Sequence, residues 1–294
     1  SADASNHFAT ANDGDGRDAD AQDPGDWNTT ETTSCNVAHS TWHGTRVAGI
    51  IGAAANTIGT IGAAYGATIL PVRVLGVCGG YVSDIAAGIQ WAAGLGVPGV
   101  PNNTGHIAKV INLSIGANSS CSATFQDAIT AARNAGSVIV VATGNDSATT
   151  ISAPANCNGV IAVTAHDRFG DTSPYANIGI GTTLSAPGGS SNTVGSGIYS
   201  TSNTGTTIPI SDTYVAGYGT SFAAPHVSAV AAMLFQIRPT ISPDAVQRYI
   251  TANARAYPLG SYCNGRSDCG AGLLDAYAAA NALLTAQGTN RAPV

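Results

Sequence analysis

The sequence is poor in charged residues, which make up 10% of its 294 positions. Acidic side chains outnumber basic ones by 17 to 11, so the formal net charge is −6. A negative protein has no electrostatic attraction for nucleic acid or for an anionic membrane surface, and we expect neither as a partner. No apolar run reaches the roughly 18 residues that a membrane-spanning helix needs. No signal peptide is recognisable, and Ser1 is typical of a processed N-terminus.

The sequence also lacks any Cys-x-x-Cys pair, which argues against zinc or thioredoxin-like chemistry. An even number of cysteines is nevertheless present. In an acidic, lysine-poor and glycine-rich chain, this favours disulfides and an oxidising, extracellular setting, with free buried thiols as the alternative. The six are Cys35, Cys78, Cys121, Cys157, Cys263 and Cys269.

Glycine, in contrast, is abundant, at 36 residues. Glycine at this level, few charges and no linker-like stretch indicate one compact domain with tight turns and a large core. We place this domain at residues 1–285 and regard residues 286–294 as a loose tail.

Predicted strands alternate with predicted helices along the chain. Apolar, β-branched runs indicate strands at 67–75, 109–113, 137–143 and 160–165. Helical patterns fall at 43–55, 84–95 (capped by Ser83), 123–135, 243–254 and 273–284, and 196–218 is typical of a hairpin. This alternation predicts an α/β fold with a mostly parallel central sheet covered by helices on both faces.

Ser221 stands in a Gly-Thr-Ser turn directly before an apolar, alanine-rich helix. A helix N-terminus offers unpaired N–H groups and a positive dipole end, which suit a developing oxyanion. Ser221 could equally be an ordinary helix N-cap. A nucleophile needs a base and an oxyanion donor, and two residues supply them: His43 opens another small-residue helix, and Asn145 ends a β-rich run in a Gly-Asn turn.

The segments His-Gly-Thr-Arg-Val-Ala-Gly at 43–49, Gly-Asn at 144–145 and Gly-Thr-Ser-Phe-Ala-Ala-Pro at 219–225 occur in that order. They resemble the signatures of subtilisin-like serine proteases, over residues 13–285. The resemblance implies a three-layer fold and a secreted endopeptidase, made as a zymogen, with peptides or proteins as substrates. Ser221 is then the nucleophile, His43 the base and Asn145 the oxyanion donor. His226 is expected to be structural, and Arg46, which replaces a second histidine of the family, to affect only local packing.

The resemblance also assigns substrate-binding residues and a disulfide pattern. The backbone of the extended substrate is expected to pair edge-to-edge with Gly79, Gly80 and Tyr81. The primary specificity pocket is expected to be apolar and to include Ser114, Ile115, Gly116, Ala142, Thr143 and Gly144. The extracellular bacterial members of the family favour the pairs Cys35–Cys78, Cys121–Cys157 and Cys263–Cys269. We otherwise expect a monomer.

An acidic stretch at residues 13–26 predicts a structural calcium site. Its carboxylates repel one another unless a hard cation gathers them, and its glycines allow the chain to wrap tightly around an ion. The candidate ligands are Asp13, Asp15, Asp18, Asp20 and Asp26. A solvated acidic loop is the alternative, because the stretch does not complete an EF-hand.

The third member of the family's catalytic triad has no counterpart in this sequence. In the family, the aspartate ends an apolar strand before the histidine motif, whereas no such run precedes His43. We therefore expect a companion segment outside this chain to supply the strand and its aspartate.

Two other functional classes are possible. A pseudoprotease or binding domain would keep the fold without the activity, although intact His43, Asn145 and Ser221 argue against it. An α/β-hydrolase esterase conflicts with the chain order, because that fold places its histidine after the serine.

Overall fold

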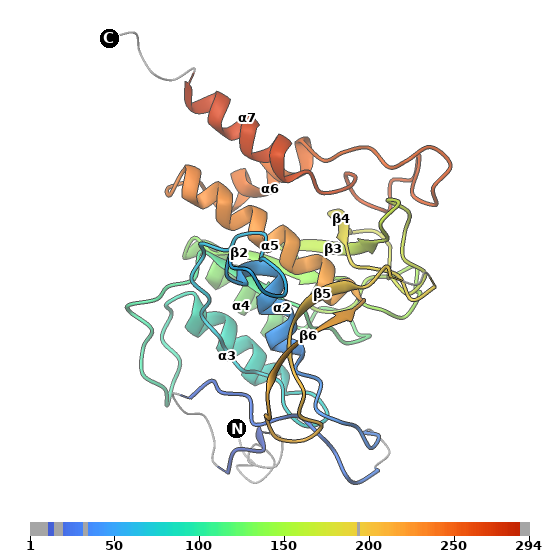
Figure 1. Ribbon diagram of the computed structural model, residues 1–294. Helices are drawn as coiled ribbons and strands as arrows, with labels where there is room; N and C mark the ends of the chain where they lie inside the picture. The colour runs from blue at the N-terminus through green and yellow to red at the C-terminus, as the bar shows by residue number, and fades with distance from the viewer. Residues whose placement is uncertain (1–10, 15–19, 32–34, 193–194, 289–294) are drawn as a thin grey trace.

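The computed structural model describes residues 11–14, 20–31, 35–192 and 195–288 as a three-layer α/β fold (Figure 1). Its central sheet has four parallel strands in the order β1-β2-β3-β4. They are β1 (Val110–Leu113), β2 (Val138–Ala142), β3 (Ile161–His166) and β4 (Leu184–Pro187). The predicted fold class is confirmed, and the carboxyl ends of all four strands meet at one edge of the sheet.

Both faces of the sheet are buried, as the side chains of β2 show. Val138, Val140 and Ala142 belong to the apolar cluster on one face, and Ile139 and Val141 to the cluster on the other. Because successive side chains of a strand point to opposite faces, a strand covered on both sides reads as a continuous apolar run. All five residues of β2 are accordingly buried.

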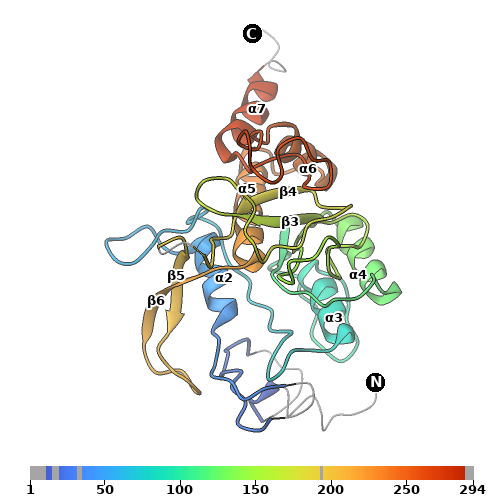
Figure 2. The ribbon, with the colours of Figure 1, turned by 90° about the vertical axis from the view of Figure 1, so that its right-hand side faces the viewer.

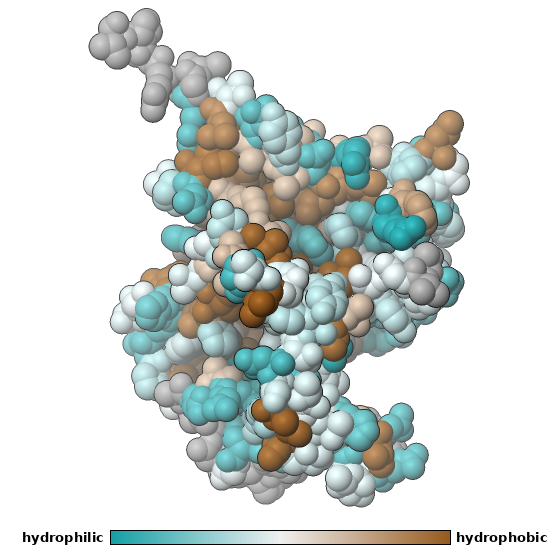
Figure 3. Space-filling model, viewed as in Figure 1, coloured by the Kyte–Doolittle hydropathy of each residue, from teal (hydrophilic) through white to brown (hydrophobic). Residues whose placement is uncertain are grey.

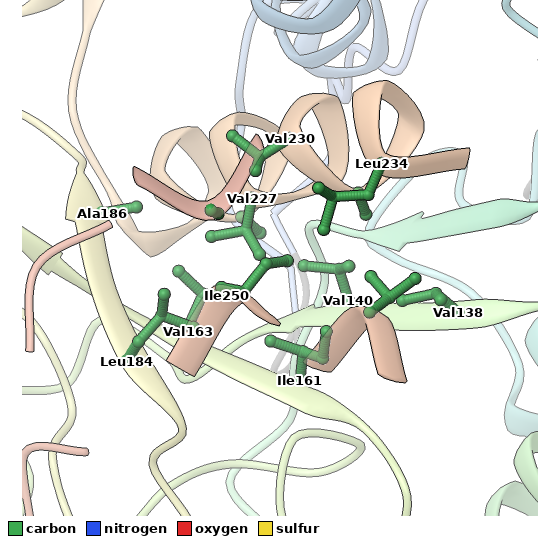
Figure 4. Close-up of a cluster of buried hydrophobic side chains, with 14 of the residues drawn as sticks. Val138, Val140, Ile161, Val163, Leu184, Ala186, Val227, Val230, Leu234 and Ile250 are labelled. Carbon is green, nitrogen blue, oxygen red and sulfur yellow. The ribbon is translucent and has the colours of Figure 1, made fainter. Parts of the chain in front are cut away.

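The first face is covered by α5 (Thr220–Ile237), α6 (Pro243–Ala252) and α7 (Ala276–Gly288). Figure 4 shows Val227 and Leu234 of α5 pointing toward Val163 and Val140 of the sheet, and Val230 belongs to the same buried cluster. By length and composition α5 could cross a membrane, but 67% of it is buried inside the fold, as in the core helix of a soluble protein. The second face is covered by α3 (Val82–Ala92) and α4 (Ala123–Asn134).

Outside the sheet, α2 (His43–Gly52) lies beside the antiparallel hairpin of β5 (Ile198–Asn203) and β6 (Asp212–Gly217) (Figure 2). Ser200 Oγ donates to the carbonyl of Arg46 at 2.6 Å, and Thr201 Oγ1 to that of Thr45 at 2.8 Å. A side chain at Gly49 would clash with both hydroxyls, so glycine permits this close approach. The predicted hairpin is confirmed, and it holds the helix that begins at His43.

Four features of the structure differ from the sequence predictions, and three of them concern the bounds or number of elements. Helix α3 begins at Val82 after Tyr81, so Ser83 lies inside it and is not its cap. Strand β4 was not predicted, because its run Leu-Ser-Ala-Pro is short and half polar. Helix α7 extends to Gly288, beyond the predicted start of the tail at residue 286.

The fourth difference is the segment 67–75, which has no strand structure. A strand needs a hydrogen-bonding partner, and in the described part of the chain the outer edge of β1 pairs with no strand. The predicted strand at 67–75 is therefore wrong for the described structure: its residues favour a strand, but no described strand lies beside the segment to complete the hydrogen bonds.

All three expected disulfides are present, and they are Cys35–Cys78, Cys121–Cys157 and Cys263–Cys269. They tie loops at the periphery of the sheet. On the face shown in Figure 3, apolar side chains form small separate groups among polar ones. Leu259 and Ile180 are the most exposed of the large apolar residues.

Candidate active site

Ser221 is the second residue of α5, one position after the helix begins at Thr220. The N-cap is Gly219, whose φ of 147° is open to glycine and strained for other residues. Ser221 is therefore not the cap, and its backbone N–H belongs to the first turn, where helices leave N–H groups without an internal partner. The side chain oxygen donates at 3.2 Å to the carbonyl of Ser114.

A proline inside α5 explains how the chain around Ser221 is held. Pro225 has no N–H, so the carbonyl of Ser221, four residues earlier, loses its helical donor. Ser114, at the end of β1, supplies the missing hydrogen bond with its hydroxyl at 2.7 Å. Asn112 Nδ2 in turn donates to Ser114 Oγ at 2.9 Å, which fixes the hydroxyl from the strand side.

Asn145 is held by the residue next to Ser221. Its Oδ1 accepts the N–H of Thr220 at 2.8 Å and the Thr220 hydroxyl at 3.0 Å. These bonds use the acceptor side of the amide, so Nδ2 is the donor that Asn145 can offer to a ligand in the cavity it lines. The positioning role of Thr220, which is fully buried, was missed in the sequence although it lies inside the serine motif.

His43 is the first residue of α2 and lies near the start of α5. Its ring meets the Phe222 ring edge-on, with centroids 6.3 Å apart and planes at 87°. The preceding Trp42 has a left-handed φ of 50° and is held there by an Nε1 hydrogen bond of 2.7 Å to the carbonyl of Gly205. Among the described residues, neither Ser221 nor a carboxylate hydrogen-bonds the His43 ring.

The electrostatic surroundings of His43 favour its neutral, basic form. Burial lowers the pKa of His43, the charge of Arg46 lowers it further, and the charge of Asp26 opposes both. Arg46 also donates from Nε to Ser202 Oγ at 3.3 Å. The prediction that Arg46 bears only on packing is therefore incomplete, because its charge acts on His43.

A cavity of about 210 Å³ adjoins Ser221. Ile115, Gly116, Ala142 and Gly144 lie on its wall, together with Asn145. The wall also carries polar residues that the sequence analysis did not single out, namely Asn118, Asp146 and Ser152. The apolar preference of this pocket stays a prediction.

The remaining predicted substrate-binding residues fall into two groups, of which one lies next to this cavity and the other does not line it. Ser114 contacts Ser221 directly, and Thr143 is fully buried behind the wall, where its hydroxyl donates to the carbonyl of Asn177 at 2.9 Å. Gly79, Gly80 and Tyr81 lie before α3 and do not line the cavity. Their pairing with a substrate stays a prediction.

The buried side chain of Asn177 organises the loop that follows β2. Its Oδ1 accepts the N–H groups of Asp146 and Ala148 at 2.8 and 3.0 Å, and its Nδ2 donates to Asp146 Oδ2 at 3.0 Å. Asn177 lies 32 positions after Asn145, so no local sequence pattern pointed to this role.

His226 lies one turn after Phe222, and its Nδ1 is 2.9 Å from the Phe222 carbonyl. Burial lowers the pKa of His226, and the hydrogen bond to the carbonyl only partly opposes it. An internal helix contact of this kind agrees with the expected structural role.

The predicted calcium ligands are only partly within the described residues. Asp15 and Asp18 lie outside them. Asp26 accepts two hydrogen bonds from Thr41, at 2.6 and 2.7 Å, and Asp13 is 3.3 Å from Arg73. Asp20 Oδ1 accepts the N–H of Gln22 at 2.9 Å. Among the described residues, no three acidic, histidine or cysteine side chains are grouped as a metal would require.

The chain resembles known proteases over almost its whole length. It is 46% identical over 280 residues to an extracellular protease of Xanthomonas campestris, covering 94% of this chain and 46% of that protein. It is 39% identical over 298 residues to an extracellular basic protease of Dichelobacter nodosus, covering 96% of this chain and 46% of that protein. The chain thus spans about half the length of these relatives.

Two further matches agree. Subtilisin Savinase of Lederbergia lenta is 37% identical over 238 residues, which cover 81% of this chain and 77% of that protein. A solved protease structure from Pseudoalteromonas arctica superposes with a TM-score of 0.89 at 44% identity, covering 94% of this chain and 81% of that one. Residues 3–289 match the model of the subtilase family of peptidases. The chain belongs to the subtilase family.

Proposed function

We propose that this protein is a secreted serine endopeptidase that cleaves peptide bonds through an acyl-enzyme. The observation that carries this proposal is the position of Ser221 in the first turn of α5, beside a cavity and next to the held amide of Asn145. Its relatives are named extracellular proteases, and three disulfides suit an oxidising compartment.

In the proposed reaction, Ser221 Oγ attacks the substrate carbonyl while His43 accepts its proton. Ser221 Oγ must first leave its bond to the Ser114 carbonyl. The developing oxyanion is met by Asn145 Nδ2 and the Ser221 N–H, which the helix dipole favours. His43 then protonates the leaving amine, and water hydrolyses the acyl-enzyme by the reverse sequence.

The aspartate that orients His43 is proposed to come from polypeptide outside this chain. Two observations support this: the outer edge of β1 has no strand partner among the described residues, and the strand-like segment 67–75 has none either. An extended segment between β1 and residues 67–75 would complete the backbone hydrogen bonds of both. Its aspartate would then lie at the same sheet edge as Ser221.

A structural calcium ion at residues 13–26 is also proposed. The oxygen-rich side chains fit the chemistry of calcium. The candidate ligands remain Asp13, Asp15, Asp18, Asp20 and Asp26. Calcium would compete with the hydrogen bonds that Asp26 accepts from Thr41 and with the ion pair between Asp13 and Arg73.

A fluorophosphonate probe tests the proposal against the pseudoprotease alternative. Active protein should be labelled at Ser221 and should cleave a peptide substrate, and Ser221→Ala should lose both activities with its melting temperature unchanged. Ser267→Ala is a matched control, because Ser267 is an exposed serine that does not line the cavity. Labelling that persists in Ser221→Ala would refute the assignment.

A further inference from the structure

A second, larger cavity of about 570 Å³ lies at the carboxyl ends of β3 and β4. It shares no lining residue with the cavity beside Ser221. Its walls come from the turn after β3, the end of β4 and the segment between α6 and α7, which covers the β4 side of the sheet (Figure 2). Cavities of this size accommodate ligands of several residues or rings.

Close packing gives this cavity a fixed floor. The backbones of Arg255 and Leu273 exchange hydrogen bonds of 2.8 and 2.7 Å, and Leu273 bridges in parallel to Ser185 of β4. Gly170, at a φ of +83°, leaves room for Leu273 and Pro258, which a side chain there would touch at 3.0 Å. The segment between α6 and α7 is therefore tied to the β4 edge of the sheet by backbone hydrogen bonds.

Hydrogen bonds to the turn after β3 fix the neighbouring disulfide loop. Asp171 Oδ1 accepts the N–H of Tyr262 at 2.9 Å, and the disulfide Cys263–Cys269 closes the loop that follows. Thr172 Oγ1 is 3.0 Å from Cys263 Sγ. The cavity is thus built between two segments that are tied to each other.

Two arginines with no ion-pair partner among the described residues, Arg168 and Arg255, line the cavity. The lining carboxylate, Asp167, accepts the N–H groups of Phe169 and Asp171 with Oδ1, at 2.9 and 3.1 Å. Its charge is thus partly used in holding the turn. In a chain with only 11 basic residues and a net charge of −6, a pair of unmatched arginines is a local attraction for anions.

The remaining walls are aromatic and apolar. The Arg168 guanidinium lies 4.8 Å from the centroid of the Phe169 ring, which is 64% exposed. Stacking of this kind fixes the plane of the guanidinium and leaves its N–H fork free for a carboxylate. Pro187, Pro258 and Leu273 add apolar surface.

His166, the last residue of β3, supplies a hydrogen-bond acceptor. Its side chain is 93% buried and lines the cavity, and Nδ1 lies 2.7 Å from the carbonyl of Asp167, to which it donates. Burial lowers the pKa of His166; the hydrogen bond to the Asp167 carbonyl and the charge of Asp167 oppose this, and the charge of Arg255 adds to it. The net lowering favours the neutral ring, in which Nε2 is an acceptor. Nε2 has no partner among the described residues, which suits an N–H group of a ligand.

The end of β4, which lines the cavity, is hydrogen-bonded to the turn that carries Ser221. Pro187 is followed by Gly188, whose carbonyl accepts the N–H of Gly219 at 3.0 Å and the Tyr175 hydroxyl at 2.7 Å. Gly219 precedes Ser221 by two residues. A polypeptide at the active site therefore has a short path to this cavity across the same sheet edge.

We propose that this cavity is an accessory subsite that binds an acidic stretch of a polypeptide substrate, with a carboxylate held by Arg168 and Arg255. This inference rests on the proposed function in that the polypeptide is the substrate. A peptide satisfies all three features of the cavity, because its carboxylate meets the arginines, its N–H meets His166 Nε2 and its side chains meet the apolar walls. A phosphate ion would leave most of the cavity unfilled.

Binding to the Ser221→Ala protein tests this subsite without cleavage. The probes are a fluorescent octapeptide with three C-terminal glutamates, the same peptide with glutamines, and inorganic phosphate as a competitor. The glutamate peptide should bind more tightly than the glutamine peptide. Arg255→Gln and Arg168→Gln should each weaken it by about three- to tenfold, and Arg248→Gln, on an exposed position of α6 away from the cavity, should not.

Equal weakening by Arg248→Gln, or equal affinity for the two peptides, would overturn the proposal. Displacement of half of the bound peptide by phosphate, at a phosphate concentration equal to the peptide's dissociation constant, would show that the cavity is a small-anion site. That result would also overturn the proposal. Melting temperatures of the variants distinguish lost binding from lost folding. Probe labelling of the protein with Ser221 intact reports the proposed function separately, so the failure of one proposal does not imply that of the other.

Discussion

Ser114 donates a 2.7 Å hydrogen bond to the carbonyl of Ser221, replacing the helical bond that Pro225 cannot make. The residue that directly follows β1 thereby fixes the first turn of the central helix. The position of the candidate nucleophile depends on this contact, because the hydroxyl and the backbone of Ser221 both meet Ser114.

We expect Ser114→Ala to lower the free energy of unfolding by about 1–3 kcal/mol, because the Ser221 carbonyl is left without a donor. Denaturant unfolding measures this, with Ser119→Ala, an exposed serine, as the control. In a Pro225→Ala background, residue 225 regains an N–H and the loss should shrink. Equal losses in both backgrounds would contradict the role assigned to Pro225.

Asn145→Leu should lower kcat by about a hundredfold or more while KM changes little, because it removes a donor that acts on developing charge. Asn145→Asp is the informative companion variant. It keeps an acceptor for Thr220 but has no donor toward the oxyanion, so it should be slow as well. If kcat held steady and KM rose, Asn145 would be a binding residue.

Arg46→Gln should move the acidic limb of the pH profile of kcat/KM to higher pH. His43 acts as a base only when neutral, and the charge of Arg46 lowers the pKa of His43. Removing that charge raises the pKa, so the neutral form requires a higher pH. Arg248→Gln changes the net charge equally and should leave the limb in place. A shift of the same size in both variants would show a general charge effect.

Chelation of calcium should lower the melting temperature and hasten self-digestion, because the carboxylates of residues 13–26 would again repel one another. The comparison is between EDTA-treated protein and the same sample after calcium is restored, in low-salt buffer. A melting temperature that EDTA leaves unchanged would favour the solvated acidic loop.

Denaturing mass spectrometry and N-terminal sequencing of probe-labelled enzyme should find polypeptide beyond residues 1–294, carrying an apolar run that ends in aspartate. It would be either continuous with the chain or bound to it. Pairing of this polypeptide with β1 would satisfy the backbone N–H and C=O groups at the edge of the sheet. Each such group costs about 1–3 kcal/mol when it is buried without a hydrogen-bond partner. Active enzyme with the mass of residues 1–294 alone would contradict this prediction.

The sequence by itself determined the parallel α/β fold, because runs such as Val138–Ala142 are apolar without alternation and are separated by helical patterns. It also indicated Ser221, His43 and Asn145 as candidate site residues, because each stands at the end of a periodic segment in a recognisable motif. The disulfide pairs followed from the family resemblance, and the structure confirmed them.

Only the tertiary structure decided which contacts hold these residues. The bonds of Ser114 to Ser221 and of Asn145 to Thr220 join positions 107 and 75 apart, and no local pattern encodes such distances. The effect of Arg46 on His43 depends on burial, which the sequence does not give. Segment 67–75 shows the same limit: its residues favour a strand, but a strand forms only where a neighbour completes its hydrogen bonds.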